Sequence, residues 1–156
     1  MLKHAGVPLF ILQLCAAVLS HPILMGHETE PHDFLEFFAG DCEVSKAILE
    51  EGLNVVAYDI RFDGVFMDIL SDLGFLNALL MALFTSWGAS SFLAIVCSTW
   101  INLNVGTSGR SQATPLGNQF YPSVAQGNKM VSRCVILLFI LHALGNAFFS
   151  NSPEAV

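Results

Sequence analysis

Hydrophobic and polar positions change their period several times along the chain, and these changes predict alternating strands and helices. Short apolar runs bounded by turn residues are typical of buried strands, and longer runs with helical spacing are typical of helices. A loop is expected at residues 98–127. The predicted strands are residues 34–38, 54–58, 92–96 and 147–150, with a short further candidate at 65–67. The predicted helices are residues 43–51, 72 to about 84 or 87, and 128–144.

Alternating strands and helices favour an α/β fold. We expect a truncated, doubly wound parallel sheet of four to five strands, with right-handed crossover connections. In the first helix, Ile48 and Leu49 are expected to face inward, and Asp72 is expected to cap the second helix.

The turn after the first strand carries the most informative chemistry. The strand ends in Ala39-Gly40, and Asp59 ends the next strand, nineteen residues after Gly40. In nucleotide-binding α/β domains such a turn admits the ligand and such an acid binds a ribose hydroxyl. Asp41 and Glu43 place negative charge where a phosphate would lie. The pattern therefore favours a nucleoside with a cationic centre, such as S-adenosylmethionine.

Three motifs resemble class I methyltransferases, especially the cytosine-C5 type. Glu36-Phe-Phe-Ala-Gly40 with Tyr58-Asp59 is similar to that family's first motif, D-L-F-A-G-x-G, and to its ribose-binding acid. Cys97 lies where the family has its Pro-Cys nucleophile, and Asn151-Ser152-Pro153 lies where it has Glu-Asn-Val or Glu-Asn-Pro.

The chain also resembles a loosely defined group of algal methyltransferase-like proteins. Members of that group read E-L-F-A-G-x-x-E-V-S-K-A, then C-S-S-W and G-T-S-G-R-S. The matching segments here are residues 36–47, 97–100 and 106–111, and the likeness covers about residues 33–154.

The resemblance implies a Rossmann-like methyltransferase fold that binds S-adenosylmethionine through Gly40 and Asp59, with Asp68 placed to reach the adenine amine. It also makes Cys97 a candidate nucleophile. However, the proline before the cysteine is replaced by Val96, and the family's acidic residue is replaced by Ser150 or Asn151. We therefore expect a vestigial cofactor site, with Cys97 as a small buried residue and no methyl-transfer activity.

The two later helices show almost no polar stripe. The crossover rule places both on the sheet face opposite the first helix, where they would expose an apolar patch that needs a cover. Residues 73–96 are uncharged and long enough to span a membrane, but the small polar cluster at 85–91 favours helix, turn and strand. His142 is interpreted as a buried imidazole or, in a pigment-bearing membrane, a chlorophyll ligand. Some of the following residues are expected to point outward, since together they are too many for one side of the sheet to bury: Leu76, Leu79, Leu80, Leu83, Val135, Leu138, Phe139 and Leu141.

Charge and composition argue against nucleic-acid binding and against a cysteine-based metal site. The net charge of the 156-residue chain is −7, which argues against nucleic-acid binding. Twelve of the thirteen acids lie between Glu28 and Asp72, and only 12% of the residues are charged. The four cysteines have no metal-binding spacing.

The N-terminal segment is a second hydrophobic outlier. Residues 5–19 are apolar except for Gln13, Ser20-His-Pro follows them, and the segment extended to Gly26 is 22 residues long. We interpret residues 1–26 as a secretory-type signal or retained membrane anchor; the alternative is an additional packing helix. Residues 27–33 form a polar linker whose His and acidic side chains are more simply solvated than metal-bound, and the α/β domain spans 34–156.

Two functions from different classes follow. The first is a non-catalytic structural subunit that docks through its apolar helix face onto a hydrophobic protein in a membrane-associated complex, with lipid or pigment contact. A thylakoid photosystem or antenna assembly in a plastid is its most concrete form. The second is an active S-adenosylmethionine-dependent methyltransferase acting on a small molecule or a protein.

Overall fold

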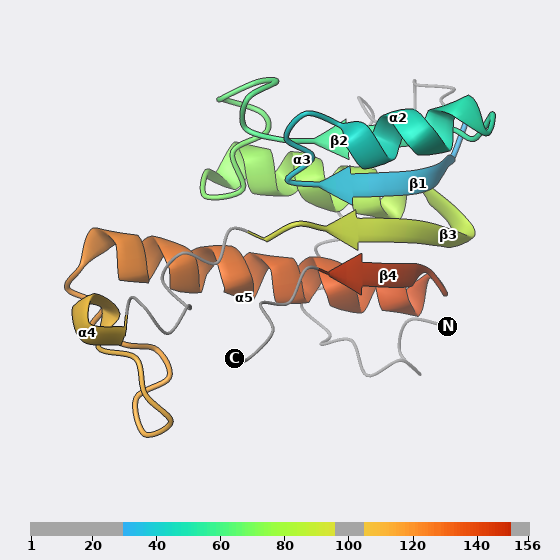
Figure 1. The fold of residues 1–156 in the computed structure, drawn as a ribbon. Coiled ribbons are helices and arrows are strands. Elements are labelled where there is room, and N and C mark those ends of the chain that lie inside the picture. The colour runs from blue at the N-terminus through green and yellow to red at the C-terminus, as the bar shows by residue number, and fades with distance from the viewer. Residues whose placement is uncertain (1–29, 96–104, 151–156) are drawn as a thin grey trace.

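The fold is a four-stranded, all-parallel sheet with helices on both faces (Figure 1). The structure is a computed structural model, and it describes residues 30–95 and 105–150. The strand order is β2-β1-β3-β4, so β1 and β3 are central. In chain order the elements are β1 (His32–Phe37), α2 (Glu43–Glu50), β2 (Val55–Tyr58), α3 (Asp72–Leu83), β3 (Thr85–Leu93), α4 (Val105–Ser108), α5 (Pro122–Ala143) and β4 (Ala147–Ser150).

The helices divide between the two faces as the crossover rule predicts. β2 lies on one side of β1, and β3 and β4 lie on the other, so right-handed connections change face after β2. Figure 1 shows α2 in front of the sheet and α3 and α5 behind it. α3 and α5 contact each other, which confirms the expectation that they share a face.

The core lies between the sheet and the pair α3 and α5. Leu35 and Phe37 of β1 are completely buried against this pair. On α3, Ala78 and Ala82 are one turn apart and also completely buried, so their small side chains allow close packing. Cys134 of α5 lies in the same core, where burial raises the pKa of its thiol to about 12.

Strand β3 differs most from the sequence-based expectation. It begins at Thr85, although the cluster of small polar residues at 85–91 had indicated a turn. Three of its small residues are buried: Thr85, Ala89 and Ser91. The segment is extended because β3 pairs with β1 on one side and with β4 on the other. The register shifts between His32 and Phe34. Because α3 ends before this strand, residues 73–95 are not one continuous helix.

Three local expectations were wrong. Residues 65–67 are not a strand, because the Asp63 side chain accepts hydrogen bonds from the amides of Val65 and Phe66 and closes a turn. Leu49 points outward and is 61% exposed, while Ser45 is the buried residue of α2. Ser71, rather than Asp72, caps α3, since its Oγ accepts from the amide of Gly74 at 2.8 Å.

Helix α5 is longer than expected at its N-terminus. It starts at Pro122 rather than at residue 128, and proline is favoured in the first turn, where its missing N–H needs no partner. The short helix α4 lies within the segment that had been expected to form one long loop.

Candidate functional site

A cavity of about 420 Å³ lies at the carboxyl ends of the three strands β1, β2 and β3. The turn after β1, the end of β2 and the residue after β3 all contribute to its wall. Gly40, Asp59 and Asp68, the three residues expected to bind a cofactor, all line it. Its full lining is Phe38, Gly40, Tyr58, Asp59, Ile60, Arg61, Met67, Asp68, Ile69, Leu70, Ala94 and Met130.

The turn between β1 and α2 adopts an unusual backbone conformation. Phe38 and Cys42 both have φ of 59° and Gly40 has φ of 56°, so three residues lie in the left-handed region. This conformation is uncommon for residues with a side chain. The amide of Gly40 donates to Oδ2 of Asp59 at 2.9 Å, which ties the turn to the end of β2.

Asp59 is a buried carboxylate with contacts at both oxygens. Its Oδ1 accepts from the amide of Arg61 at 2.9 Å and lies 3.5 Å from Nε of the same residue. The Arg61 guanidinium also pairs with Asp41 at 3.2 Å. A carboxylate has about four lone-pair positions, so Asp59 keeps acceptor capacity for a ligand hydroxyl.

The two acids of the turn do not crowd the cavity. Asp41 is largely exposed and pairs with Arg61, while Glu43 is largely exposed and pairs with Lys46 at 2.9 Å. Neither is among the residues that line the cavity. Negative charge beside a bound ligand would therefore come from the lining acids rather than from Asp41 or Glu43.

A second buried carboxylate satisfies the N-terminus of α2. Glu36 of β1 accepts from the amide of Ser45 at 2.9 Å and from its hydroxyl at 2.5 Å. The N-cap residue Cys42 provides no side-chain hydrogen bond, so Glu36 performs this role from the neighbouring strand. Helix N-termini commonly bind phosphate. Here the amide of Ser45 already donates its hydrogen bond to the Glu36 carboxylate.

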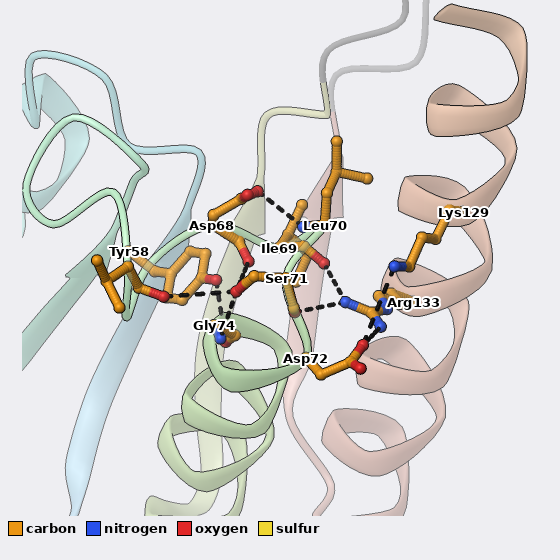
Figure 2. Close-up of polar contacts among 10 residues, drawn as sticks. Tyr58, Asp68, Ile69, Leu70, Ser71, Asp72, Gly74, Lys129 and Arg133 are labelled. Carbon is orange, nitrogen blue, oxygen red and sulfur yellow. Dashed lines mark hydrogen bonds and ion pairs between the residues drawn. The ribbon is translucent and has the colours of Figure 1, made fainter. Parts of the chain in front are cut away.

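Residues 68–70 form the wall of the cavity next to α3, and Arg133 of α5 holds the segment 68–71 in place (Figure 2). The Arg133 guanidinium donates to the carbonyl oxygens of Ile69 at 2.9 Å and Ser71 at 2.5 Å. It also pairs with the Asp72 carboxylate and lies over the Phe75 ring, 4.7 Å from its centroid. The guanidinium lowers the pKa of Asp72 through this hydrogen bond.

Tyr58 links the same wall to β2. Its hydroxyl donates to the carbonyl oxygen of Gly74 at 3.0 Å (Figure 2). Burial raises the pKa of this hydroxyl, and the negative charge of Asp68 raises it further. Tyr58 therefore remains a hydrogen-bond donor across the physiological range.

Replacing Arg133 by Lys should loosen this wall. A lysine keeps the charge but cannot reach two carbonyls and a carboxylate together, and hydrogen bonds from charged groups contribute about 1.5–3 kcal/mol each. We expect about 2 kcal/mol lower stability in urea unfolding and faster hydrogen exchange at the amides of Leu70 and Ser71. Lys129→Ala is the control, because exposed Lys129 lies 4.0 Å from the same carboxylate. Equal exchange rates in both variants would contradict this role for Arg133.

The sequence did not single out Arg61, Arg133 or the pair Glu36 and Ser45. The sequence could have suggested Arg61, because it follows Asp59 by two residues and both lie at the end of the second predicted strand. The other contacts join residues from different elements, so only the tertiary structure brings them together.

The remaining candidates lie elsewhere. Cys97 and residues 151–153 are outside the described residues, as are residues 1–26 and the first three residues of the linker. His142 is exposed rather than buried, at the end of α5. Within residues 30–95 and 105–150, no group of three or more His, Cys, Asp or Glu side chains is arranged to hold a metal.

The apolar residues of α3 and α5 divide between the core and the surface. Leu79 and Leu141 are buried in the core, because each points toward the sheet. Leu76, Leu80, Leu83 and Leu138 are half-buried, and Val135 and Phe139 remain exposed. In the described parts of the chain, α5 is the one helix long and apolar enough to cross a membrane, a test that core helices also pass.

No family model, curated protein or solved structure matches this chain. The geometry of the cavity therefore carries the functional argument.

Proposed function

We propose that this chain is an S-adenosylmethionine-binding α/β domain of the methyltransferase type. The observation that carries the proposal is that Gly40, Asp59 and Asp68 meet in one cavity at the carboxyl ends of three parallel strands. Ligands of open α/β sheets bind at this edge. A volume of about 420 Å³ also falls in the range of small-molecule sites.

The charges favour a cationic nucleoside over a nucleotide. Asp59 and Asp68 are the acids in the lining, and Arg61 is the one base among the described lining residues. Arg61 already pairs with Asp59, so the two acids and one base of the lining together carry a net negative charge. A phosphate would be repelled here, whereas a sulfonium would be attracted.

The lining residues fit the parts of such a ligand. Asp59 would accept a ribose hydroxyl, and Asp68 would accept from the adenine amine. Apolar side chains such as Ile60, Ile69 and Leu70 would contact the adenine ring and exclude water from it. The bound cofactor would supply an electrophilic methyl group.

Titration calorimetry of the full chain with S-adenosylmethionine tests the proposal. We expect saturable binding to the wild type and no binding of ATP. Asp68→Asn should weaken the affinity about tenfold, the equivalent of about 1.4 kcal/mol for one lost charge. The amide oxygen of the variant can still accept from the amide of Leu70, as Asp68 does at 2.8 Å, so the fold is retained.

Asp63→Asn is the matched control. Asp63 also accepts hydrogen bonds from backbone amides, but its side chain does not line the cavity. Its affinity should equal that of the wild type. Absence of binding to a folded wild-type chain would reject this proposal and favour the non-catalytic structural subunit instead.

A further inference from the structure

An apolar groove lies between α5 and the edge strand β4, on the far side of the sheet from α2. Its volume is about 330 Å³, and its lining is Val135, Leu138, Phe139, His142 and Phe148. Three of these side chains are substantially exposed: Val135 is 43%, Phe139 46% and Phe148 44% exposed.

The chemistry of the groove selects an apolar occupant. Among its lining residues only His142 can ionise, so the groove offers no fixed charge for a charged peptide. Contiguous exposed apolar surface usually marks a contact with another apolar element. Parallel sheets in particular are covered on both faces.

The chain itself contains a segment of matching character. Residues 5–19 contain one polar side chain, Gln13, and no charge, and they lie outside the described residues. As a helix, these fifteen residues would be about 22 Å long. α5 is 22 residues long, so its surface can accommodate a helix of that length.

The connection to the fold allows the segment to reach the groove. Phe34 of β1 is level with Ser90 of β3, and Ser90 is level with Ala147 of β4. The groove therefore begins near the level at which the N-terminal segment enters the sheet. β4 lies two strand spacings from β1, about 10 Å. The twelve residues from 20 to 31 can span up to about 40 Å when extended.

We infer that the groove between α5 and β4 is the docking site of the chain's own segment 5–19. Covalent attachment gives this segment an effective concentration in the millimolar range, well above that of a separate partner protein. The segment thus acts as an additional packing helix that covers Val135, Phe139 and Phe148. This inference does not depend on the ligand of the cavity.

Chemical crosslinking of the full chain tests this inference. Residue 15 is a natural cysteine within the segment, and His142→Cys places a second thiol in the lining of the groove. With a short bismaleimide and peptide mapping, we expect an intrachain product between residues 15 and 142 whose yield does not change on dilution. Glu50→Cys is the control, because Glu50 is exposed on α2, on the opposite face of the sheet.

A second substitution identifies the contact. Adding Phe139→Asp to the His142→Cys chain should lower the intrachain yield several-fold, while buried Cys134 stays protected from alkylation in a folded protein. A product between chains that declines on dilution would overturn the inference in favour of a second copy. Equal yields for the His142→Cys and Glu50→Cys chains would also overturn it. Loss of the product together with protection of residue 15 by phosphatidylcholine vesicles would assign the segment to lipid and overturn it too.

Discussion

Replacing Gly74 by Ala is expected to destabilise the domain by about 3 kcal/mol or more, at the upper end of overpacking effects. A Cβ at this position would lie 2.1 Å from the carbonyl oxygen of Asp68 and 2.6 Å from its carbonyl carbon. These are backbone atoms of the cavity wall, so they cannot move aside as a side-chain end could. Urea unfolding monitored by circular dichroism measures the loss.

Gly64→Ala is the matched control for this change. Gly64 lies in the same connection between β2 and α3, and a Cβ there would have no heavy atom within 4 Å. Its effect should be small, or stabilising by about 0.4–1 kcal/mol through the unfolded state. If Gly74→Ala retained both stability and ligand affinity, the close packing of α3 against segment 68–71 would be wrong.

Replacing Glu36 by Ala is expected to cost about 3 kcal/mol. The change leaves the amide and the hydroxyl of buried Ser45 without their acceptor, and each unsatisfied buried group costs about 1–3 kcal/mol. It also removes the negative charge that stabilises the N-terminus of α2. Thermal unfolding should show a correspondingly lower Tm, by about 6–12 °C.

Two further variants separate these contributions. Glu36→Gln keeps an acceptor for the amide of Ser45 and should lose less stability than Glu36→Ala. Glu50→Ala, at the exposed end of α2, should change the stability by about 0.5 kcal/mol or less. Equal losses for Glu36→Ala and Glu50→Ala would show that the carboxylate does not cap the helix.

Local patterns predicted the first half of the fold well. β1, α2 and β2 lie within one or two residues of their expected bounds, because each is a short run with one clear period and a turn residue after it. The start of β3 could not be predicted from a local run of this kind. Its residues are small and polar, and their burial depends on strands that precede and follow them by about fifty residues in the sequence.

In the candidate site too, the sequence predicted what depends on local spacing and missed the contacts between distant residues. The spacing of Gly40 and Asp59 reflects one strand-helix-strand unit, so the sequence alone could place both at the same edge of the sheet. The contacts of Arg133 with Ile69 and Ser71 join residues more than sixty positions apart. No local pattern encodes such a contact. The inward orientation expected for Leu49 is also wrong, since Leu49 is 61% exposed, whereas Ser45 is buried and bonded to Glu36.

The strand order has a consequence for how the chain folds during synthesis. β1 pairs with β2, which follows closely, but also with β3, where Asp33 meets Ser86 fifty-three residues later. One edge of the central strand therefore stays open until β3 has left the ribosome, and β4 closes the sheet last. Long-range parallel pairing of this kind slows folding and exposes strand edges meanwhile. We expect the nascent domain to depend on chaperones until the residues of α5 and β4 have emerged.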